Sequence, residues 1–368
     1  MKNTFGTSLT VTLFGESHGE AIGAILDGLA PGIPVEEEYL RHRLTLRRPA
    51  GAISTARREA DEFRILSGVF EGRTTGTPLC ILIPNTAAHS ADYAAARALA
   101  RPGHADYTAF CKYHGFEDYR GGGHFSGRLT AALVAAGALV QSALAACGIR
   151  IGTHVLRCGG VPDRPFSEGA ALAGEIDVLD ARAFGVLDEV AGERMIAAVT
   201  AAAAEGDSVG GVTETAVVGV PAGVGEPWFD ALESTLSHIL FSVPAVKGVE
   251  FGDGFDLAGL RGSEANDPFR LDGGRVVTAS NHNGGINGGI TNGMPIRFRC
   301  AVKPTPSIFR EQQTVDFLAN EEATLTLRGR HDPAVVHRAR VVIDSVTALA
   351  LADALVLRFG TDWLGGGR

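Results

Sequence analysis

The feature that most constrains the fold is a stretch without any charged residue, from Leu129 to Ile149. A helix over this stretch would be long enough to cross a bilayer, so a membrane span has to be weighed. The stretch is rich in alanine and therefore only mildly apolar, and Gly137, Gln141 and Ser142 interrupt it. These properties favour a helix buried in the core of the protein over a membrane span.

Three consecutive glycines, Gly121 to Gly123, lie just before this stretch, between Arg120 and Arg128. Glycine has no Cβ, so its backbone N–H groups are exposed and a ligand can approach closely. The two guanidinium groups suit phosphate or carboxylate, and the N-terminus of the following helix favours anions. A glycine-rich run beside arginine is more often only a mobile surface loop. Its position at the start of a buried helix predicts an anion-binding site instead.

The composition is that of an ordinary globular protein, with 45% hydrophobic and 20% charged residues among 368. A chain of this length can form two domains or one large unit. The net charge of −9 argues against general nucleic-acid binding, which needs a basic face. The 48 glycines are not periodic, which predicts many tight turns. The five scattered cysteines indicate neither a disulfide framework nor a zinc site, and no signal-peptide pattern opens the sequence, which favours a reducing cytoplasm.

Arginine is concentrated in one short region beside several acidic residues. For most of these arginines we expect a solvated surface whose charge is balanced by Glu59, Asp61 and Glu62. The arginines concerned are Arg41, Arg43, Arg47, Arg48, Arg57, Arg58 and Arg64.

Hydrophobic periodicity predicts strands and helices without a clear βαβ alternation, which indicates the α+β class. The predicted strands are Leu9–Phe14, Arg64–Phe70, Leu79–Pro84, Thr213–Val218 and Pro295–Val302. The predicted helices are Val35–Leu46, Leu129–Cys147, Leu187–Ala204, Trp228–Ser242 and Arg338–Leu357. Long glycine-rich connections lie between these elements, and so many long loops in one chain favour function.

Two groups of motifs indicate a family. Gly15-Glu16-Ser17-His18-Gly19 follows the first predicted strand, and Arg101-Pro102-Gly103-His104-Ala105-Asp106 precedes the three glycines. With further motifs in the same order, they make the chain resemble chorismate synthase from about Ser8 to Leu357. These further motifs include Arg47-Arg48-Pro49, Gly206-Asp207-Ser208-Val209-Gly210-Gly211, Ser280-Asn281-His282, Lys303-Pro304-Thr305 and Gly329-Arg330-His331-Asp332-Pro333.

The resemblance implies one domain over residues 1–368, folded as a β-α-β sandwich with helices between antiparallel sheets and long functional loops. It also implies a cytoplasmic homotetramer that binds neither nucleic acid nor membrane and holds no metal. The implied reaction is that of a lyase of the shikimate pathway: 1,4-elimination of phosphate from 5-enolpyruvylshikimate 3-phosphate, which gives chorismate and requires reduced FMN. Whether NADPH reduces the flavin on this protein, or reduced FMN comes from outside, stays open.

The substrate carries two carboxylates and a phosphate, so several arginines must converge, and proton donors that titrate near neutral pH are needed. By the resemblance, His18 protonates the departing phosphate and His104 the reduced flavin. Asp332 accepts the substrate proton through the flavin, with Ser17 as a relay; otherwise such an aspartate is a turn or cap residue. The candidate substrate arginines are Arg47, Arg48, Arg128 and Arg330.

The flavin contacts implied by the resemblance come from several separate segments. They are Arg47, His124, Phe125, Ser126, Pro244, Ala245, Gly288, Lys303, Pro304, Thr305, Pro306, Ser307 and Arg330. The chain departs from the usual family pattern in that His124-Phe125 replaces arginine and serine, and Pro244, which has no N–H, replaces asparagine. An arginine usual after Arg47-Arg48-Pro49 is also missing. No G-x-G-x-x-G motif follows a strand, so a Rossmann unit is not indicated.

Two other functions stay open on the sequence. One is a transferase acting on a phosphorylated shikimate-type ring, which would share the arginines but need no flavin. The other is a non-catalytic paralogue that binds flavin or the phosphorylated ring for regulation. The presence of His18, His104 and Asp332 argues against the second.

Overall fold

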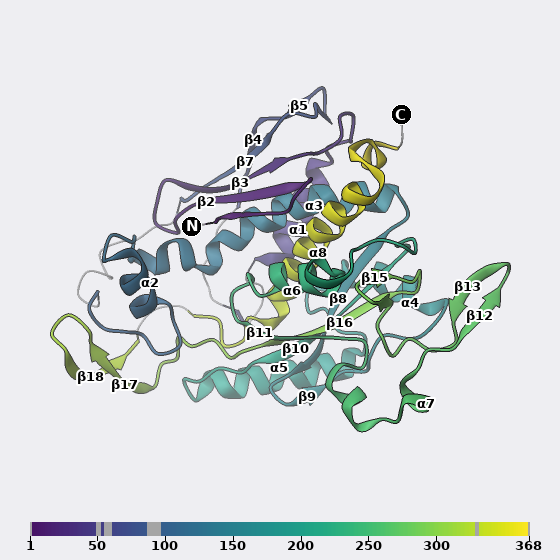
Figure 1. The fold of residues 1–368 in the computed structure, drawn as a ribbon. Helices are drawn as coiled ribbons and strands as arrows, with labels where there is room; N and C mark the ends of the chain where they lie inside the picture. Colours follow the sequence, from purple (N-terminus) through teal and green to yellow (C-terminus); the bar gives the residue numbers. More distant parts are fainter. Residues whose placement is uncertain (1, 49–52, 55–60, 87–96, 328–330, 367–368) are drawn as a thin grey trace.

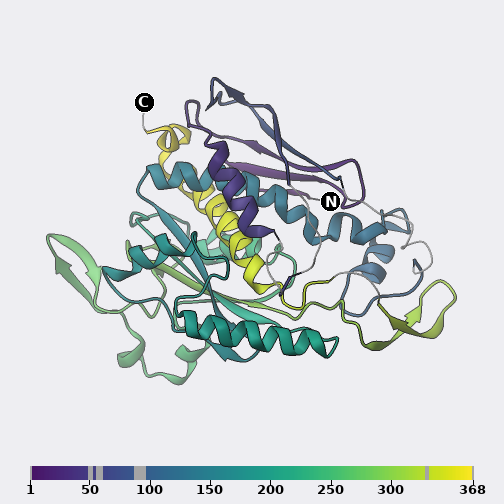
Figure 2. The same cartoon turned by 180° about the vertical axis from the view of Figure 1, so that it is seen from behind.

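The computed structural model describes residues 2–48, 53–54, 61–86, 97–327 and 331–366. These residues form two five-stranded antiparallel sheets with long helices between them (Figure 1). The view from behind shows the same succession of sheet, helices and sheet (Figure 2). The mixture of helices and antiparallel strands agrees with the α+β class predicted from the sequence.

The first sheet has the strand order β1-β2-β3-β7-β4. Its strands are β1 (Thr4–Phe5), β2 (Thr10–Gly15), β3 (Ala21–Asp27), β4 (Arg64–Ser67) and β7 (Leu79–Pro84). The predicted strand over Arg64–Phe70 is divided at Gly68, and its end forms the hairpin of β5 (Val69–Phe70) and β6 (Arg73–Thr74). Gly68 has a φ of +84°, and a Cβ there would lie 2.5 Å from Leu79 Cα, so only glycine fits this turn.

The second sheet has the strand order β11-β16-β10-β8-β9. Its strands are β8 (Arg150–Cys158), β9 (Val161–Pro162), β10 (Gly211–Val218), β11 (Val246–Phe251) and β16 (Ile296–Val302). Three hairpins extend from this part of the chain. They are β12 (Phe269–Asp272) with β13 (Arg275–Thr278), β14 (Ile286–Asn287) with β15 (Ile290–Thr291), and β17 (Glu311–Asp316) with β18 (Glu321–Thr326).

Two long helices form the centre of the molecule, α3 (Thr130–Ala146) and α8 (Val336–Phe359). They pack against each other, α3 also against the first sheet and α8 against the second. At their crossing, a Cβ on Gly137 would lie 2.4 Å from the Cβ of Ser345, so glycine permits the close approach. By length and composition the segment 127–146 could cross a membrane, but 83% of the apolar window is buried inside the fold, as predicted for a core helix.

The other helices cover this centre or the outside of the sheets. The helices α1 (Glu37–Arg47) and α6 (Leu232–Leu240) pack against α8, whereas α4 (Ala171–Leu179) and α5 (Glu189–Ala204) pack against the second sheet. The remaining helices are α2 (Asp106–Tyr113) and α7 (Gly262–Ala265), and the 3₁₀ turns are η2 (Arg120–Phe125), η3 (Gly127–Leu129), η4 (Trp228–Asp230), η5 (Gly254–Gly259) and η6 (Thr361–Gly365).

The helix predicted over Trp228–Ser242 is wrong in its first turn. Trp228 has a φ of +65° and Ala231 has extended backbone with a ψ of 142°. The α-helical part therefore begins only at Leu232, after a separate 3₁₀ turn.

Candidate functional site

His104 lies in the loop before α2 and contacts the loop that follows β16. Its Nε2 is 2.8 Å from Ser307 Oγ, and its Nδ1 is 3.1 Å from the carbonyl oxygen of Pro102. Because a carbonyl only accepts, Nδ1 carries the proton, and the Ser307 hydroxyl can donate to Nε2 of the neutral ring. Burial, followed by the positive charge of Arg101, lowers the pKa of His104 to about 4. The imidazole is therefore neutral near pH 7 when no ligand is bound.

Hydrogen bonds hold the loop Lys303–Ser307 beside His104. Lys303 Nζ donates to Gly103 O at 2.7 Å, and Lys303 N donates to Ala245 O at 2.9 Å. The Ser208 hydroxyl donates to Thr305 O at 2.6 Å. Three sequence motifs that are far apart in the chain therefore meet around one histidine.

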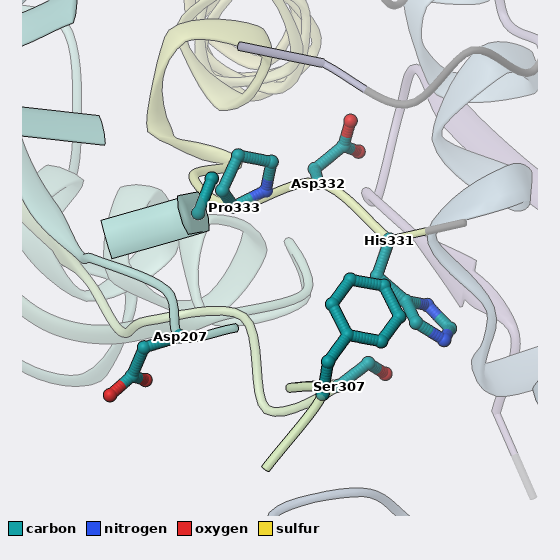
Figure 3. Close-up of a pocket in the computed structure, with 7 residues that line it drawn as sticks. Asp207, Ser307, His331, Asp332 and Pro333 are labelled. Atoms are coloured by element: carbon teal, nitrogen blue, oxygen red, sulfur yellow. The ribbon is translucent and has the colours of Figure 1, made fainter. Parts of the chain in front are cut away.

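Ser307 also lines a small pocket of about 50 Å³ with His331 and Asp332. In Figure 3 the side chains of His331 and Asp332 point in opposite directions from their shared backbone. Asp332 is buried, and its carboxylate forms a close ion pair with Arg338 Nη1. Burial, followed by the charge of Arg101, lowers the pKa of His331. Asp332 therefore lines one pocket with Ser307, the residue that contacts His104.

His18 packs against the three glycines. Its Nδ1 lies 3.1 Å from Ser17 Oγ, and a Cβ on Gly121 would come within 2.1 Å of His18 Cε1. Gly121 to Gly123 have φ values of +59°, +84° and +52°, which glycine adopts most readily. The space that the glycines leave, which we predicted for a ligand, is therefore occupied in part by the ring of His18.

Arg101 belongs to the His104 loop, and its guanidinium extends toward the glycines beside His18. Its guanidinium donates to both carboxylate oxygens of Asp106, at 2.8 and 2.7 Å. A Cβ on Gly122 would lie 4.0 Å from Arg101 Nη2, and Arg101 also lowers the pKa of His104. Arg101 therefore faces the glycines on one side and His104 on the other.

The candidate substrate arginines divide into two kinds. The side chains of Arg47 and Arg128 are only 6% and 5% exposed, and both are ion-paired with Asp61. Arg48 is 30% exposed, and its Nε lies 3.7 Å from Asp61 Oδ2. The expectation that Asp61 balances a solvated surface is wrong, because its carboxylate is fully buried. Arg330 lies outside the described residues.

Two side chains connect these arginines to the rest of the site. Asn85 accepts from Arg128 Nε at 3.1 Å and donates to Glu16 O and Gly19 O, each at 2.9 Å, which are the ends of the His18 loop. Arg338 Nε donates to Arg47 O at 2.8 Å while the same side chain pairs with Asp332. The His18 loop, Asp332 and the arginines gathered by Asp61 thus belong to one network of hydrogen bonds and ion pairs.

Sequence reasoning missed Asp61, Asn85, Arg101 and Arg338. The only signals were the position of Arg101 inside a motif and of Asp61 inside the arginine-rich region.

His124 and Phe125 line a second and wider cavity. It measures about 300 Å³, and Phe14 and Tyr113 complete its aromatic walls. His124 Nδ1 donates to Gly15 O at 2.8 Å, so this nitrogen faces the chain. Ser126, predicted beside them, caps the next turn by accepting from Arg128 N at 3.3 Å.

Two further predicted flavin contacts differ in where they lie. Pro244 is exposed after the end of α6, next to Ala245, whose carbonyl oxygen accepts from Lys303 N of the loop beside His104. Gly288 occupies the exposed turn of the β14–β15 hairpin, and among the described residues no hydrogen bond or ion pair joins it to the network above.

Two histidines, a buried aspartate and several arginines on neighbouring loops are a set of residues typical of an enzyme that acts on an anionic small molecule. Comparison with known proteins identifies which enzyme family this is. The family model described as chorismate synthase matches residues 9–356. The chain belongs to the chorismate synthase family, as its motifs predict, and hence to the carbon–oxygen lyases.

Curated relatives and a solved structure give the same result. The chain is 47% identical over 353 residues to the chorismate synthase of Thermococcus kodakarensis, covering 96% of this chain and 97% of that protein. It is 43% identical over 361 residues to that of Dehalococcoides mccartyi, covering 98% of each. A structure titled "Crystal Structure of Chorismate Synthase" matches with a TM-score of 0.77 and 30% identity, covering 97% of this chain and 94% of that one.

Proposed function

We propose that the protein converts 5-enolpyruvylshikimate 3-phosphate to chorismate by 1,4-elimination of phosphate, the last common step of aromatic amino-acid biosynthesis. The observation that carries this proposal is the network of hydrogen bonds and ion pairs that joins the His18 loop to Asp332 through arginines suited to a phosphate and two carboxylates. His104 contacts Ser307, which lines one pocket together with Asp332.

We assign to His18 the donation of a proton to the leaving phosphate, a role supported by the glycine loop and Ser17, which fix its ring. His104 is neutral at pH 7 before ligands bind, since its pKa is about 4. A neighbouring anion favours the protonated form, so His104 becomes a donor only when an anionic ligand is present. Asp332, held by Arg338, is the base that we assign to the substrate proton, with Ser17 as a relay.

Reduced FMN is the cofactor that we propose, and the residues fit it. The wide cavity next to the glycine loop has three aromatic walls, and two of its residues, His124 and Phe125, are sequence-predicted flavin contacts. Lys303 and Ser307 supply donors on the loop beside His104. When bound, reduced flavin supplies an electron-rich ring to a reaction without net oxidation.

We further propose that residues 1–368 form a single domain with the β-α-β sandwich of the family, and that it assembles as a homotetramer in the cytoplasm without binding nucleic acid or membranes. Support for assembly comes from apolar side chains on the described surface. Phe255, Phe269 and Leu271 are 84%, 65% and 76% exposed. Light scattering on the purified protein checks the tetramer.

The deciding experiment measures chorismate formed from 5-enolpyruvylshikimate 3-phosphate under anaerobic conditions, with and without dithionite-reduced FMN. We expect turnover only when reduced FMN is present. Turnover of the substrate to another product without flavin would favour the transferase. Flavin binding without any turnover would favour a regulatory paralogue.

A further inference from the structure

We propose that Asp61 is a positioning residue that orients the substrate arginines, an inference that rests on the proposed function. Its carboxylate is fully buried and contacts three guanidinium groups, those of Arg47, Arg48 and Arg128. One carboxylate thus gathers all the candidate substrate arginines that the structure describes.

The two buried arginines mainly hold protein groups. Arg47 donates to Thr130 Oγ1 at 2.9 Å and to Gly127 O at 3.0 Å, both at the start of the α3 segment. Arg128 donates to Asn85 Oδ1 at 3.1 Å and to Pro84 O at 3.3 Å, at the end of β7. Asp61 therefore joins the helical layer to the first sheet at the point where the His18 loop begins.

Arg48 differs because it keeps 30% of its side chain exposed. Its Nε is buried and makes no hydrogen bond among the described residues. The attraction to Asp61 Oδ2 at 3.7 Å is therefore the interaction that orients the Arg48 side chain. Its backbone N–H is fixed by Leu44 O and Thr45 O at the end of α1. Arg48 is thus the member of the set whose direction depends on Asp61 and whose end can reach a ligand.

The backbone conformation of Asp61 allows a substitution that removes the charge of its side chain without changing the shape. Its φ is +48°, in the left-handed region in which both aspartate and asparagine are enriched. The substitution Asp61→Asn therefore keeps the backbone and the side-chain outline while it removes the negative charge. Without that charge the three cations repel one another and Arg48 turns toward solvent.

The experiment compares Asp61→Asn, Arg48→Gln and the double variant with the matched control Asp344→Asn. Asp344 is equally buried and binds Arg43 Nη2 at 2.6 Å, and among the described residues no hydrogen bond or ion pair joins it to Arg47, Arg48 or Arg128. The readouts are kcat, KM for 5-enolpyruvylshikimate 3-phosphate with saturating reduced FMN, substrate Kd by calorimetry, and Tm. Inactive wild-type protein would refute the proposed function and not the role of Asp61.

We expect Asp61→Asn to raise KM and Kd about 10-fold or more, and the control to lower Tm while KM stays within about 2-fold. The double variant should lie within about 3-fold of Arg48→Gln, because Asp61 acts through Arg48. The proposal would be overturned if the increases in KM of the two single variants multiplied in the double variant. It would also be overturned if Asp61→Asn lowered Tm but left KM within about 2-fold of wild type, as expected for the control. If Asp61→Asn does not fold, Asp61→Glu replaces it: the charge is kept but displaced, so KM must still rise, and a wild-type KM would overturn the positional role.

Discussion

His104 should take up a proton when an anionic ligand binds beside it. Burial and the charge of Arg101 lower its pKa to about 4 in the ligand-free protein. At pH 7 this is about three units below the pH, so roughly one ring in 10³ is protonated. Since one pKa unit corresponds to about 1.4 kcal/mol, protonation costs about 4 kcal/mol, an upper figure because the ring keeps some contact with solvent.

A bound anion removes part of this cost, because an opposite charge within about 4–6 Å stabilises the imidazolium. Between the ligand-free pKa and the raised ligand-bound pKa, binding then takes up close to one proton. By linkage, ligand affinity falls about 10-fold for each unit that the pH rises within this window. Below pH 4 and above the ligand-bound pKa, affinity no longer depends on His104.

Calorimetric titration of FMN and 5-enolpyruvylshikimate 3-phosphate at pH 6.5, in two buffers of different ionisation enthalpy, measures the protons taken up. The variant His104→Gln should take up about one proton fewer than wild type. The control His42→Gln, an exposed histidine on α1, should match wild type. Subtracting the proton uptake of the variant from that of wild type removes the contribution of the ligands and of the groups that the two proteins share. Equal proton uptake in wild type and His104→Gln would refute the reasoning.

Three further outcomes follow from named contacts. Ser307→Ala removes the 2.8 Å contact to His104 Nε2 and should lower kcat about 10-fold at unchanged Tm, measured with saturating reduced FMN; unchanged kcat would contradict a role for this hydroxyl. Arg338→Gln removes the ion pair to Asp332 and the bond to Arg47 O and should lower kcat about 10–10²-fold, whereas an effect on KM alone would assign Arg338 to substrate binding. Burial opposes the charge of His154, but its bonds to Asp163 and Glu214 outweigh burial and raise its pKa. Its contribution to the free energy of unfolding is therefore complete below about pH 6.5 and is lost as the pH rises through the raised pKa. In urea unfolding, His154→Gln should lower the free energy of unfolding by about 1–3 kcal/mol at pH 6 and by less at pH 9. An equal decrease at both pH values would contradict this sign.

The elements that could be predicted from the sequence are those whose apolar pattern is long or strictly alternating. Strand β7 has the predicted bounds, and α3 and α8 were found because they are long and apolar. Strand β3 was missed because Gly23 interrupts it, and glycine normally marks a break in a strand. In the fold that glycine is required, since a Cβ there would lie 2.4 Å from the backbone oxygen of Ile81 on the neighbouring strand β7. Such a requirement exists only once the strands are paired.

In the candidate site, too, the sequence does not show which of two neighbouring residues has which role. Arg47 and Arg48 stand together in one motif, and nothing in the sequence separates them. Arg47 is the last residue of α1 and points into the helical layer, whereas Arg48 has left the helix, with a ψ of 154°. That change of backbone turns one guanidinium toward protein carbonyls and leaves the other partly exposed. The motif therefore identifies both arginines as candidates. Which of them can reach a substrate depends on the packing of α1 against α3 and on the buried carboxylate of Asp61, which comes from a segment with no recognisable pattern.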